Sequence, residues 1–335
     1  MITRIVTMAI LLASLFGAPV FAAEPGPPLP VNIAYQADLG WLQFAARELK
    51  LFEKVGLAPK HVKFLAGAPM IAAAQGQSID IAVPGLVPFL TGRGQGVDWV
   101  IIGVDAAGAT QEGFVARQDV GIQTLADLKG KKIGYFRAST AHYGLVTGLR
   151  KNHIGLDQVT LLQMPPAQQL AAMVNKDIDA AEVWEPWMQK MVHQANGKVL
   201  ALEADLGLYS AVGAIAVRRD WLASHRETAS RFMSALVLAS EALKKDASPG
   251  IRVVAQEMGI PEEWAAKMYK DEPPAIERWL DPTYPYSLAA GGGMQKSLDD
   301  IARFLYEEKV VAKPVSASGV IDSSVIAEAL KTTKR

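Results

Sequence analysis

The segment LAAMVNKDIDAA (170–181) repeats the pattern of IAAAQGQSIDIA (71–82) at an offset of 99 residues. Both segments end in an Ile-Asp pair followed by small or apolar residues. Three further pairs of segments align in the same order at offsets of 99 or 100: VGL (55–57) with IGL (154–156), HVKFL (61–65) with TLLQM (160–164), and IAY (33–35) with IGY (133–135). Four segments in one order at nearly one spacing indicate a duplicated unit.

Each copy of the unit has the pattern strand, helix, strand, helix, strand. Short apolar runs alternate with segments whose apolar residues recur at helical spacing, such as Leu42, Ala46 and Leu49 within 39–54. Strands that alternate with helices are typical of parallel sheets built from βαβ units. The sequence therefore predicts an α/β protein with two similar, Rossmann-like lobes in tandem.

Two segments are expected to cross between the lobes. EGFVAR (112–117) leads from the first copy into the second, and GAIAVRRDWL (213–222) resembles a strand that returns to the first lobe. We therefore expect crossings near 112–117 and 214–219. The first lobe would hold residues 23–114, the second 115–216, and residues 217–335 would form the return strand and helices that pack back on the first lobe. Two crossings make a hinge, so the lobes can close on a ligand in the cleft between them.

The N-terminus has the layout of a secretory signal peptide. A short basic start precedes a mostly apolar run and a small-residue ending at Ala22. Thr7, Ser14, Gly17 and Pro19 interrupt the run, whereas a transmembrane anchor needs about 18 unbroken apolar residues. We therefore expect residues 1–22 to be cleaved and the mature chain to be exported.

Composition and motifs argue against several classes of protein. The chain contains no cysteine, which excludes disulfides, thiolate metal sites and cysteine nucleophiles. Its 34 basic and 34 acidic residues leave no charge excess for nucleic acid or membranes. The five histidines lack metal-ligand spacing, and no nucleophile elbow or phosphate-binding loop is present. Glu182 and Glu185 are three apart at a strand end and form no convincing acid pair, so we expect no catalytic residues, metal or cofactor.

The loops after the predicted strands are the candidate ligand-binding segments, because ligands of open parallel sheets lie beyond the carboxyl ends of the strands. Ser139 and Thr140 directly precede a predicted helix, where hydroxyl side chains cap the helix and the N–H groups behind them can hold an anion. The alternative is that they only cap the helix. Gly67 and the residue after it would supply matching N–H groups from the first lobe. His142 would either pack or contact the ligand.

The segments LADLKGKKIGYFRASTAHYGLVTGLRKNHI (125–154) and QMPPAQQLAAMVNKDIDAAEVWEPW (163–187) resemble the substrate-binding proteins of ABC importers for taurine, alkanesulfonates and nitrate. The resemblance is strongest to the taurine branch. In the first lobe it includes AYQ (34–36), GAPMIAA (67–73), DIAVPG (80–85) and EGFVAR, so it covers essentially the whole mature chain. It implies a type II periplasmic binding protein: two lobes joined by two hinge crossings, with the ligand cleft between them.

The resemblance also implies roles for individual residues. Ser139, Thr140 and His142 match the family's anion-holding helix start, and Trp184 matches the aromatic residue that covers the ligand from the second lobe. The remaining matches are Gly85, a small residue after the third strand, and Gln36 and Glu112, which occupy positions where the taurine branch also has Gln and Glu.

The segment GLYSAVGAIAV (207–217) departs from the taurine branch. Tyr209 replaces a tryptophan, and Gly213 or Ala214 occupies the position of the aspartate that would receive the taurine amine. This departure weakens the case for an amine on the ligand. Trp41, Trp184 and Tyr209 favour a bulkier or aromatic organic anion, and Glu185 would either bind an amine or face solvent.

The resemblance implies a periplasmic, monomeric solute-binding protein that delivers a small organic anion to a membrane permease and its ATPase. Taurine or another organosulfonate is the favoured ligand, and nitrate, a carboxylate or an aromatic anion is the alternative. An enzyme on the same scaffold is less favoured, because the sulfinate desulfinase of this fold needs a cysteine nucleophile that the chain does not contain.

Overall fold

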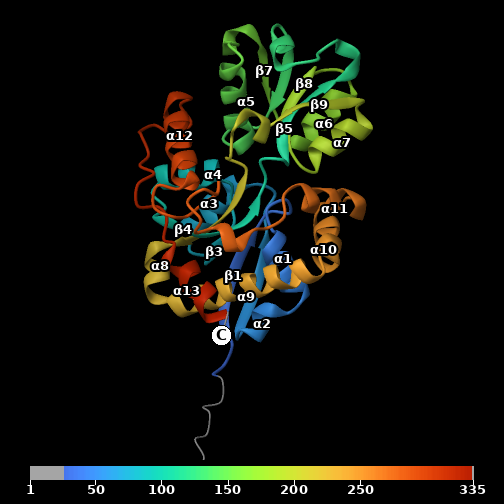
Figure 1. The fold of residues 1–335 in the computed structure, drawn as a ribbon. Coiled ribbons are helices and arrows are strands. Elements are labelled where there is room, and N and C mark those ends of the chain that lie inside the picture. Colours follow the sequence, from blue (N-terminus) through green and yellow to red (C-terminus); the bar gives the residue numbers. More distant parts are fainter. Residues whose placement is uncertain (1–25, 334–335) are drawn as a thin grey trace, which may run out of the picture.

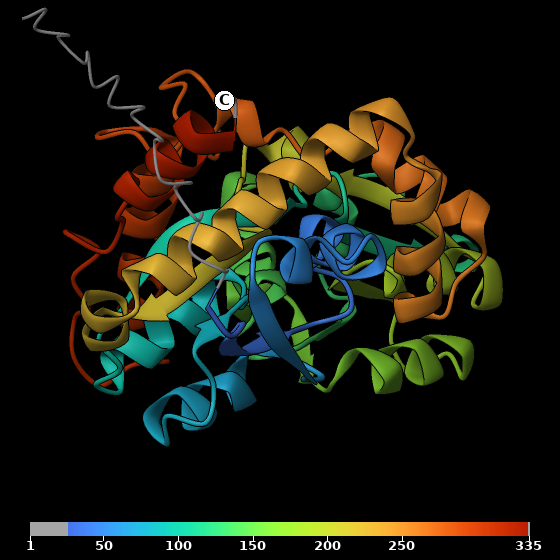
Figure 2. The same ribbon diagram turned by 90° about the horizontal axis from the view of Figure 1, so that it is seen from below.

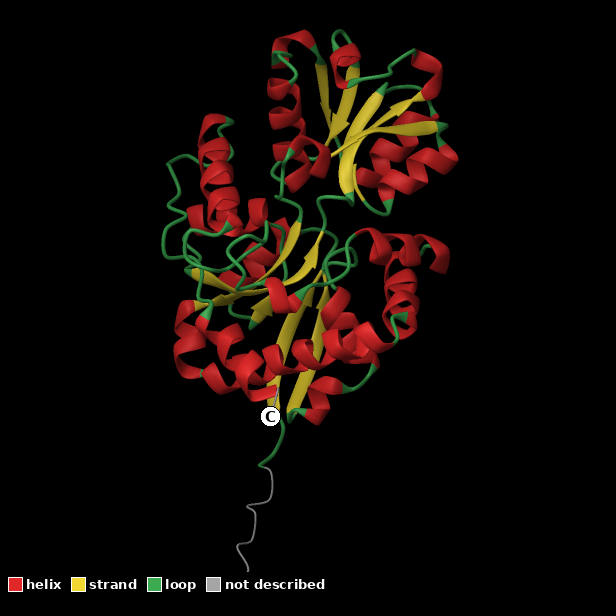
Figure 3. Cartoon of the chain, in the orientation of Figure 1, coloured by secondary structure: helices red, strands yellow, loops and turns green. Residues whose placement is uncertain are grey.

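The computed structural model describes residues 26–333 and consists of two α/β lobes, each built on a five-stranded mixed sheet (Figures 1 and 3). The expected signal peptide, residues 1–22, lies outside the described residues. Within 26–333, no helix combines the length and the apolar character needed to cross a bilayer.

The first lobe contains the strand order β2-β1-β3-β10-β4. Its strands are β1 (Leu29–Tyr35), β2 (Leu57–Lys63), β3 (Ile81–Ala82), β4 (Trp99–Ala107) and β10 (Val212–Arg218). β1 pairs in parallel with β2 and β3, whereas β10 is antiparallel to both β3 and β4.

The second lobe contains the equivalent order β7-β6-β8-β5-β9. Its strands are β5 (Glu112–Arg117), β6 (Lys132–Tyr135), β7 (Thr160–Gln163), β8 (Ala180–Trp184) and β9 (Gly197–Leu202). The fold class predicted from the sequence is confirmed, but the sheets are mixed rather than all parallel. The antiparallel strands are β10 and β5, which follow the crossings and so run opposite to the three strands of the duplicated unit.

The duplicated unit has the same strand register in both lobes. Ile33 pairs with Ile81 in the first lobe, and Ile133 pairs with Ala180 in the second, as offsets of 100 and 99 require. The repeated aspartate also has one role in each copy. Asp80 Oδ2 accepts the backbone N–H of Asn32 at 2.7 Å, and Asp179 Oδ2 accepts that of Lys132 at 2.9 Å. The Ile-Asp pair therefore ties the third strand of each unit to its first strand.

The crossings lie at 108–111, between β4 and β5, and at 203–211, between β9 and β10. The expected lobe boundaries at 114/115 and 216/217 fall inside β5 and β10, which lie in the second and first sheets respectively. Hydrogen bonds join the two crossings, because Glu203 N donates to Glu112 O and Ala204 N donates to Ala109 O, both at 2.9 Å. The two connections thus run side by side.

The helices cover the two sheets (Figure 3). The second lobe carries α5 (Thr140–Lys151), α6 (Pro166–Val174) and α7 (Trp187–Gln194). The first lobe carries α1 (Trp41–Glu48), α2 (Leu51–Lys54), α3 (Gly67–Gln75), α4 (Leu86–Gly94), α8 (Arg219–Ser224), α9 (Arg226–Lys245), α10 (Ser248–Met258), α11 (Glu262–Asp271), α12 (Gly293–Glu307) and α13 (Ser324–Thr333). Short 3-10 turns span Gln118–Val120, Leu125–Leu128, Leu156–Gln158, Ala204–Leu206 and Ile276–Arg278.

The C-terminal helices pack on the first lobe, as Figure 2 shows for the long helix α9. The ring of Phe232 in α9 stacks on Phe52 of α2 with centroids 5.4 Å apart, and both side chains are fully buried. Burying each aromatic side chain contributes about 1.5–3 kcal/mol. From β10 onward, the chain therefore belongs to the first lobe.

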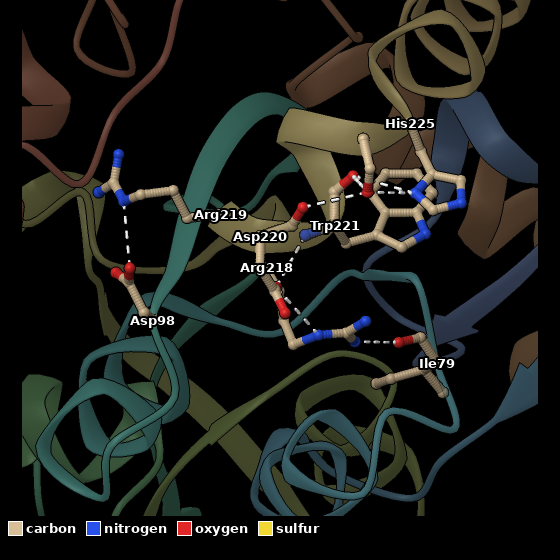
Figure 4. A network of polar contacts seen from close by, with 8 residues as sticks. Ile79, Asp98, Arg218, Arg219, Asp220, Trp221 and His225 are labelled. Carbon is tan, nitrogen blue, oxygen red and sulfur yellow. Dashed lines mark hydrogen bonds and ion pairs between the residues drawn. The ribbon is translucent and has the colours of Figure 1, made fainter.

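The end of β10 is anchored by a network of polar contacts (Figure 4). Arg218 Nη1 donates to the carbonyl oxygen of Ile79 at 2.7 Å, and Arg219 Nε donates to Asp98 Oδ2 at 3.2 Å. The exposed pair between Arg219 and Asp98 contributes at most about 1 kcal/mol. These contacts join the return strand to the segments before β3 and β4.

Helix α12 also contacts the second lobe. Arg150 of α5 donates from Nη1 to Glu307 Oε2 at 3.1 Å and from Nη2 to Glu308 Oε1 at 2.6 Å. Arg137 Nη2 donates to the carbonyl oxygens of Glu308 and Lys309, each at 3.1 Å. These contacts connect the two lobes outside the cleft.

Candidate ligand-binding site

A cavity lies between the lobes, at the carboxyl ends of their parallel strands. Both lobes and both crossings contribute to its wall. The lining residues are Gln36, Asp38, Leu39, Ala66, Gly67, Ala68, Gly85, Pro88, Gly108, Gln111, Glu112, Phe136, Ala138, Ser139, Thr140, Trp184, Glu185, Ala211 and Val212. Of the predicted site residues, eight are among them and Trp41, His142 and Tyr209 are not.

Three helices begin at the cavity wall. α3 begins at Gly67, α4 follows its N-cap Gly85, and α5 follows its N-cap Ser139. The first N–H groups of a helix have no partner within the helix, and the helix dipole places partial positive charge there. Three such helix starts around one cavity favour an anionic group on a ligand.

Ser139 and Thr140 direct their hydroxyl groups toward the protein. Ser139 Oγ accepts the N–H of His142 at 3.3 Å and donates to the carbonyl oxygen of Phe136 at 2.6 Å. Thr140 Oγ1 donates to Glu112 Oε1 at 2.9 Å. The capping alternative therefore describes the Ser139 hydroxyl, and the Thr140 hydroxyl is bound to Glu112 instead. The backbone N–H groups of α5 remain the groups that an anion would meet.

Gly85 brings the first lobe against the second. A Cβ atom at this position would lie 3.1 Å from Cγ2 of Thr140 across the cleft. Trp184 ends β8 at the position equivalent to Gly85, and its ring centroid is 6.5 Å from that of Phe136. One wall therefore lets the second lobe approach closely, while the other carries an aromatic pair.

Carboxyl groups supply the charge of the cavity wall. Asp38, Glu112 and Glu185 line it, and the lining contains no Lys, Arg or His among the described residues. Burial raises the pKa of Asp38 and of Glu185 to about 7 and raises that of Glu112 well above its usual range. These acids could receive a cationic group of a ligand.

Trp41 lies outside the cavity because it is the first residue of α1 and points into the core of the first lobe. Its side chain is only 1% exposed, and its ring lies 5.4 Å from that of Tyr269 in α11. The cavity is lined instead by Asp38 and Leu39 from the same loop.

His142 and Tyr209 also pack against aromatic residues. His142 is buried between Tyr135 and Phe304, each with its ring centroid 5.0 Å away, and burial lowers its pKa to about 4. The neutral imidazole therefore contributes no charge to an anion site at physiological pH. Tyr209 lies edge-on to Tyr286 at 5.7 Å and lines a separate hollow.

The sequence reasoning also missed part of the wall. Asp38 lies in the loop after the IAY segment (33–35), and Phe136 directly follows the IGY segment (133–135), so the rule about strand ends could have found both. Ala138 lies in the loop directly after the first strand of the second unit, so the same rule could have found it, whereas Gln111 gave no such signal. Ala138 has a φ of 61°, in the left-handed region that residues with a Cβ atom rarely adopt, directly before the α5 cap.

A buried glutamate cluster, Glu112, Glu182 and Glu203, lies behind the cavity wall. One carboxylate oxygen from each residue lies within 4.8 Å of the others, and all three side chains are at most 1% exposed. Glu182 sends its side chain to this cluster, whereas Glu185 lines the cavity and accepts the N–H of Gln189 at 3.1 Å. Glu112 is the member of the cluster that also lines the cavity.

The resemblance seen in the sequence is confirmed by known proteins. The chain is 27% identical over 298 residues to a putative aliphatic sulfonates-binding protein of Bacillus subtilis (strain 168), covering 88% of this chain and 83% of the relative. It is 25% identical over 303 residues to the taurine-binding periplasmic protein of Escherichia coli (strain K12), covering 88% and 92%.

Solved structures show the same fold. The alkanesulfonate-binding protein SsuA from Xanthomonas axonopodis pv. citri, bound to MOPS, matches with a TM-score of 0.72 and 23% identity, covering 89% of this chain and 99% of that one. The desulfurization enzyme DszB matches with a TM-score of 0.69 at 14% identity, covering 91% and 99%.

The model of the NMT1-like family matches residues 27–258, well over half of the chain. This range includes every residue that lines the cavity and all three members of the buried glutamate cluster. The chain therefore belongs to the NMT1-like family.

Proposed function

We propose that this protein is the periplasmic solute-binding component of an ABC importer and acts as a monomer. It closes its two lobes on a small organosulfonate and delivers it to the permease and ATPase. The observation that carries the proposal is the interlobe cavity onto which three helices direct their N-termini. The sulfonate- and taurine-binding relatives support the ligand class.

Taurine, a zwitterionic aminosulfonate, suits this cavity better than a simple anion. Helix N-termini would hold the sulfonate, and Asp38 and Glu185 would receive the ammonium group. These two carboxyl groups replace the acid that is missing at Gly213 or Ala214. Nitrate or a simple carboxylate would leave the acidic part of the wall without a partner, which disfavours both.

The role that we infer is binding and release without chemical change. The desulfurization enzyme DszB shares the fold at 14% identity, but the present chain contains no cysteine to act as a nucleophile. The sulfonate- and taurine-binding relatives, at 27% and 25% identity, are binding proteins.

The test is a thermal-shift screen of the mature chain followed by calorimetry. Taurine and ethanesulfonate form a matched pair, because they differ only in the amino group. We expect taurine to bind with 1:1 stoichiometry and to raise the unfolding temperature more than ethanesulfonate, with nitrate the weakest of the three. Stabilisation by ethanesulfonate but not by taurine would contradict the proposed role of Asp38 and Glu185 in binding an ammonium group. The absence of stabilisation by any sulfonate would contradict the ligand class.

A further inference from the structure

The buried glutamate cluster brings three acidic side chains together without a basic partner among residues 26–333. The charged groups that act on its members are other carboxylates: Glu203 and Asp38 act on Glu112, and Glu272 acts on Glu203. An array of this kind requires either protons or a cation in its midst.

The three carboxylates differ in how far their oxygens are satisfied. Glu112 accepts from Thr140, and Glu203 accepts from the hydroxyl of Ser210 at 2.9 Å and from the N–H of Ala211 at 3.3 Å. Glu182 is completely buried, yet neither of its oxygens has a hydrogen-bond partner in the described part of the chain. Buried polar atoms in folded proteins are almost always paired, so the carboxylate of Glu182 indicates a missing partner within the cluster.

The helix above the cluster leaves space for these oxygens. α5 has a glycine at position 144, where a Cβ atom would lie 2.5 Å from Glu182 Oε1 and 2.6 Å from Glu203 Oε1. Glycine in a helix interior is unfavourable relative to alanine, so its presence here points to a steric requirement. The positive N-terminal end of α5 also favours negative charge at this position.

We propose that the buried glutamate cluster binds one divalent cation of the size of Ca²⁺. Carboxylate oxygens are the ligands that such hard cations prefer. Ca²⁺ accepts carboxylate oxygens in flexible geometry, whereas Mg²⁺ demands near-ideal octahedral geometry and usually keeps several waters. The oxygens of the cluster lie within 4.8 Å of one another and belong to side chains that are at most 1% exposed, so an all-protein site of this kind suits Ca²⁺.

The site would tie together the part of the second lobe from which both crossings leave. Glu112 begins β5, Glu182 lies in β8, and Glu203 directly follows β9. Since Glu112 also lines the ligand cavity, a bound ion would fix the carboxylate that forms part of the wall. The site does not depend on the identity of the organic ligand.

The test is calorimetric titration of Ca²⁺, Mn²⁺ and Mg²⁺ into chelator-treated mature protein without any organic ligand. We expect one Ca²⁺ per chain, with binding weakened at least about tenfold by Glu182→Gln and by Gly144→Ala. Glu53→Gln, an exposed change in α2, should bind Ca²⁺ like the wild-type chain. Circular dichroism and metal-free thermal unfolding would show that each variant is folded.

Three results would overturn the assignment. They are no binding of any of the three cations at millimolar concentration, equal Ca²⁺ binding by the wild-type chain and Glu182→Gln, and tighter binding of Mg²⁺ than of Ca²⁺. Repeating the sulfonate screen with Ca²⁺ and with a chelator separates the two proposals. If the protein binds a sulfonate but none of the cations, only the cation proposal is contradicted.

Discussion

The two lobes place buried carboxylates differently around equivalent helices. In the first lobe, Asp105 of β4 accepts the N–H groups of Leu42 and Gln43 at 2.6 and 3.1 Å, so a carboxylate of the protein occupies the start of α1. In the second lobe, the start of α5 opens onto the ligand cavity. The duplicated scaffold therefore carries one helix start that is satisfied internally and one that is available for a ligand.

The third strands of the two units show a second difference. Val83 and Glu182 are equivalent at the offset of 99, and both are completely buried. The first lobe has an apolar side chain at this position, whereas the second has an unpartnered carboxylate. The same backbone framework thus serves packing in one lobe and a charged cluster in the other.

Removing the Asp105 carboxylate, which accepts the N–H groups at the start of α1, should have the largest effect on stability. We expect Asp105→Ala to lower the free energy of unfolding by about 2–4 kcal/mol, because two buried N–H groups lose their acceptor. Urea denaturation followed by circular dichroism measures the change. Asp105→Asn keeps an acceptor oxygen and should lose less, and equal losses in both variants would show that the charge rather than the hydrogen bonds is responsible.

Replacing Glu182 by valine, the residue type at the equivalent position of the first lobe, should stabilise the protein. In the presence of a chelator at pH 7.5, we expect Glu182→Val to raise the free energy of unfolding by about 1–3 kcal/mol, because a buried acid without a partner is replaced by an apolar side chain. The exposed change Glu53→Gln should stay within about 0.5 kcal/mol of wild type. Destabilisation by Glu182→Val would show that the carboxylate has a stabilising partner even without added cations.

The raised pKa values predict how stability depends on pH. Burial raises the pKa of Asp105, Glu185 and Glu203 to about 7 in the folded protein, whereas the unfolded values are 3.8 for Asp and 4.5 for Glu. Between about pH 4.5 and pH 7 the folded state holds more protons, so its stability is greatest at the acidic end and falls as the pH rises.

Urea denaturation at several pH values with a chelator present checks this trend. We expect a fall of at least about 2 kcal/mol between pH 5 and pH 7.5, the share of a single group whose pKa rises from 4.5 to about 7, and a smaller fall in Glu182→Val, which lacks one titrating group. Stability that rises with pH over this range would contradict the assignment of these acids as protonated in the folded state.

The smallest effect on stability is expected from substitution of Ser139, the N-cap of α5. Ser139→Ala removes the cap of α5, which should cost about 1 kcal/mol of stability. Because the Ser139 hydroxyl already donates to Phe136, affinity for a sulfonate should fall only modestly in calorimetry. Ser139→Thr keeps the hydroxyl and is the control; a loss of affinity in Ser139→Ala of more than about a hundredfold would mean that the hydroxyl itself contacts the ligand.

Local sequence patterns predicted the repeated units well. The Ile-Asp pairs, the apolar strands and the cap at Ser139 depend on neighbours or on residues within the same unit. The pairing of Ile33 with Ile81, and its counterpart in the second lobe, lies at the offsets read from the sequence.

Contacts between distant segments could not be predicted in this way. Trp41 is drawn into the core by Tyr269, and His142 by Phe304, both from the C-terminal helices. The buried glutamate cluster likewise joins Glu182 to Glu112 of β5 and to Glu203, which follows β9. A carboxylate in an apolar strand appears in the sequence as an exception to the pattern, and only the tertiary structure shows which groups it meets.

The contacts of α12 with α5 bear on how quickly a bound ligand leaves. The ion pairs of Arg150 with Glu307 and Glu308 join the lobes far from the cavity wall, and their side chains are partly exposed. Salt screens such pairs, since the Debye length falls to about 10 Å at 0.1 M ionic strength. The dissociation rate of the ligand should therefore rise with ionic strength although no atom that touches the ligand has changed.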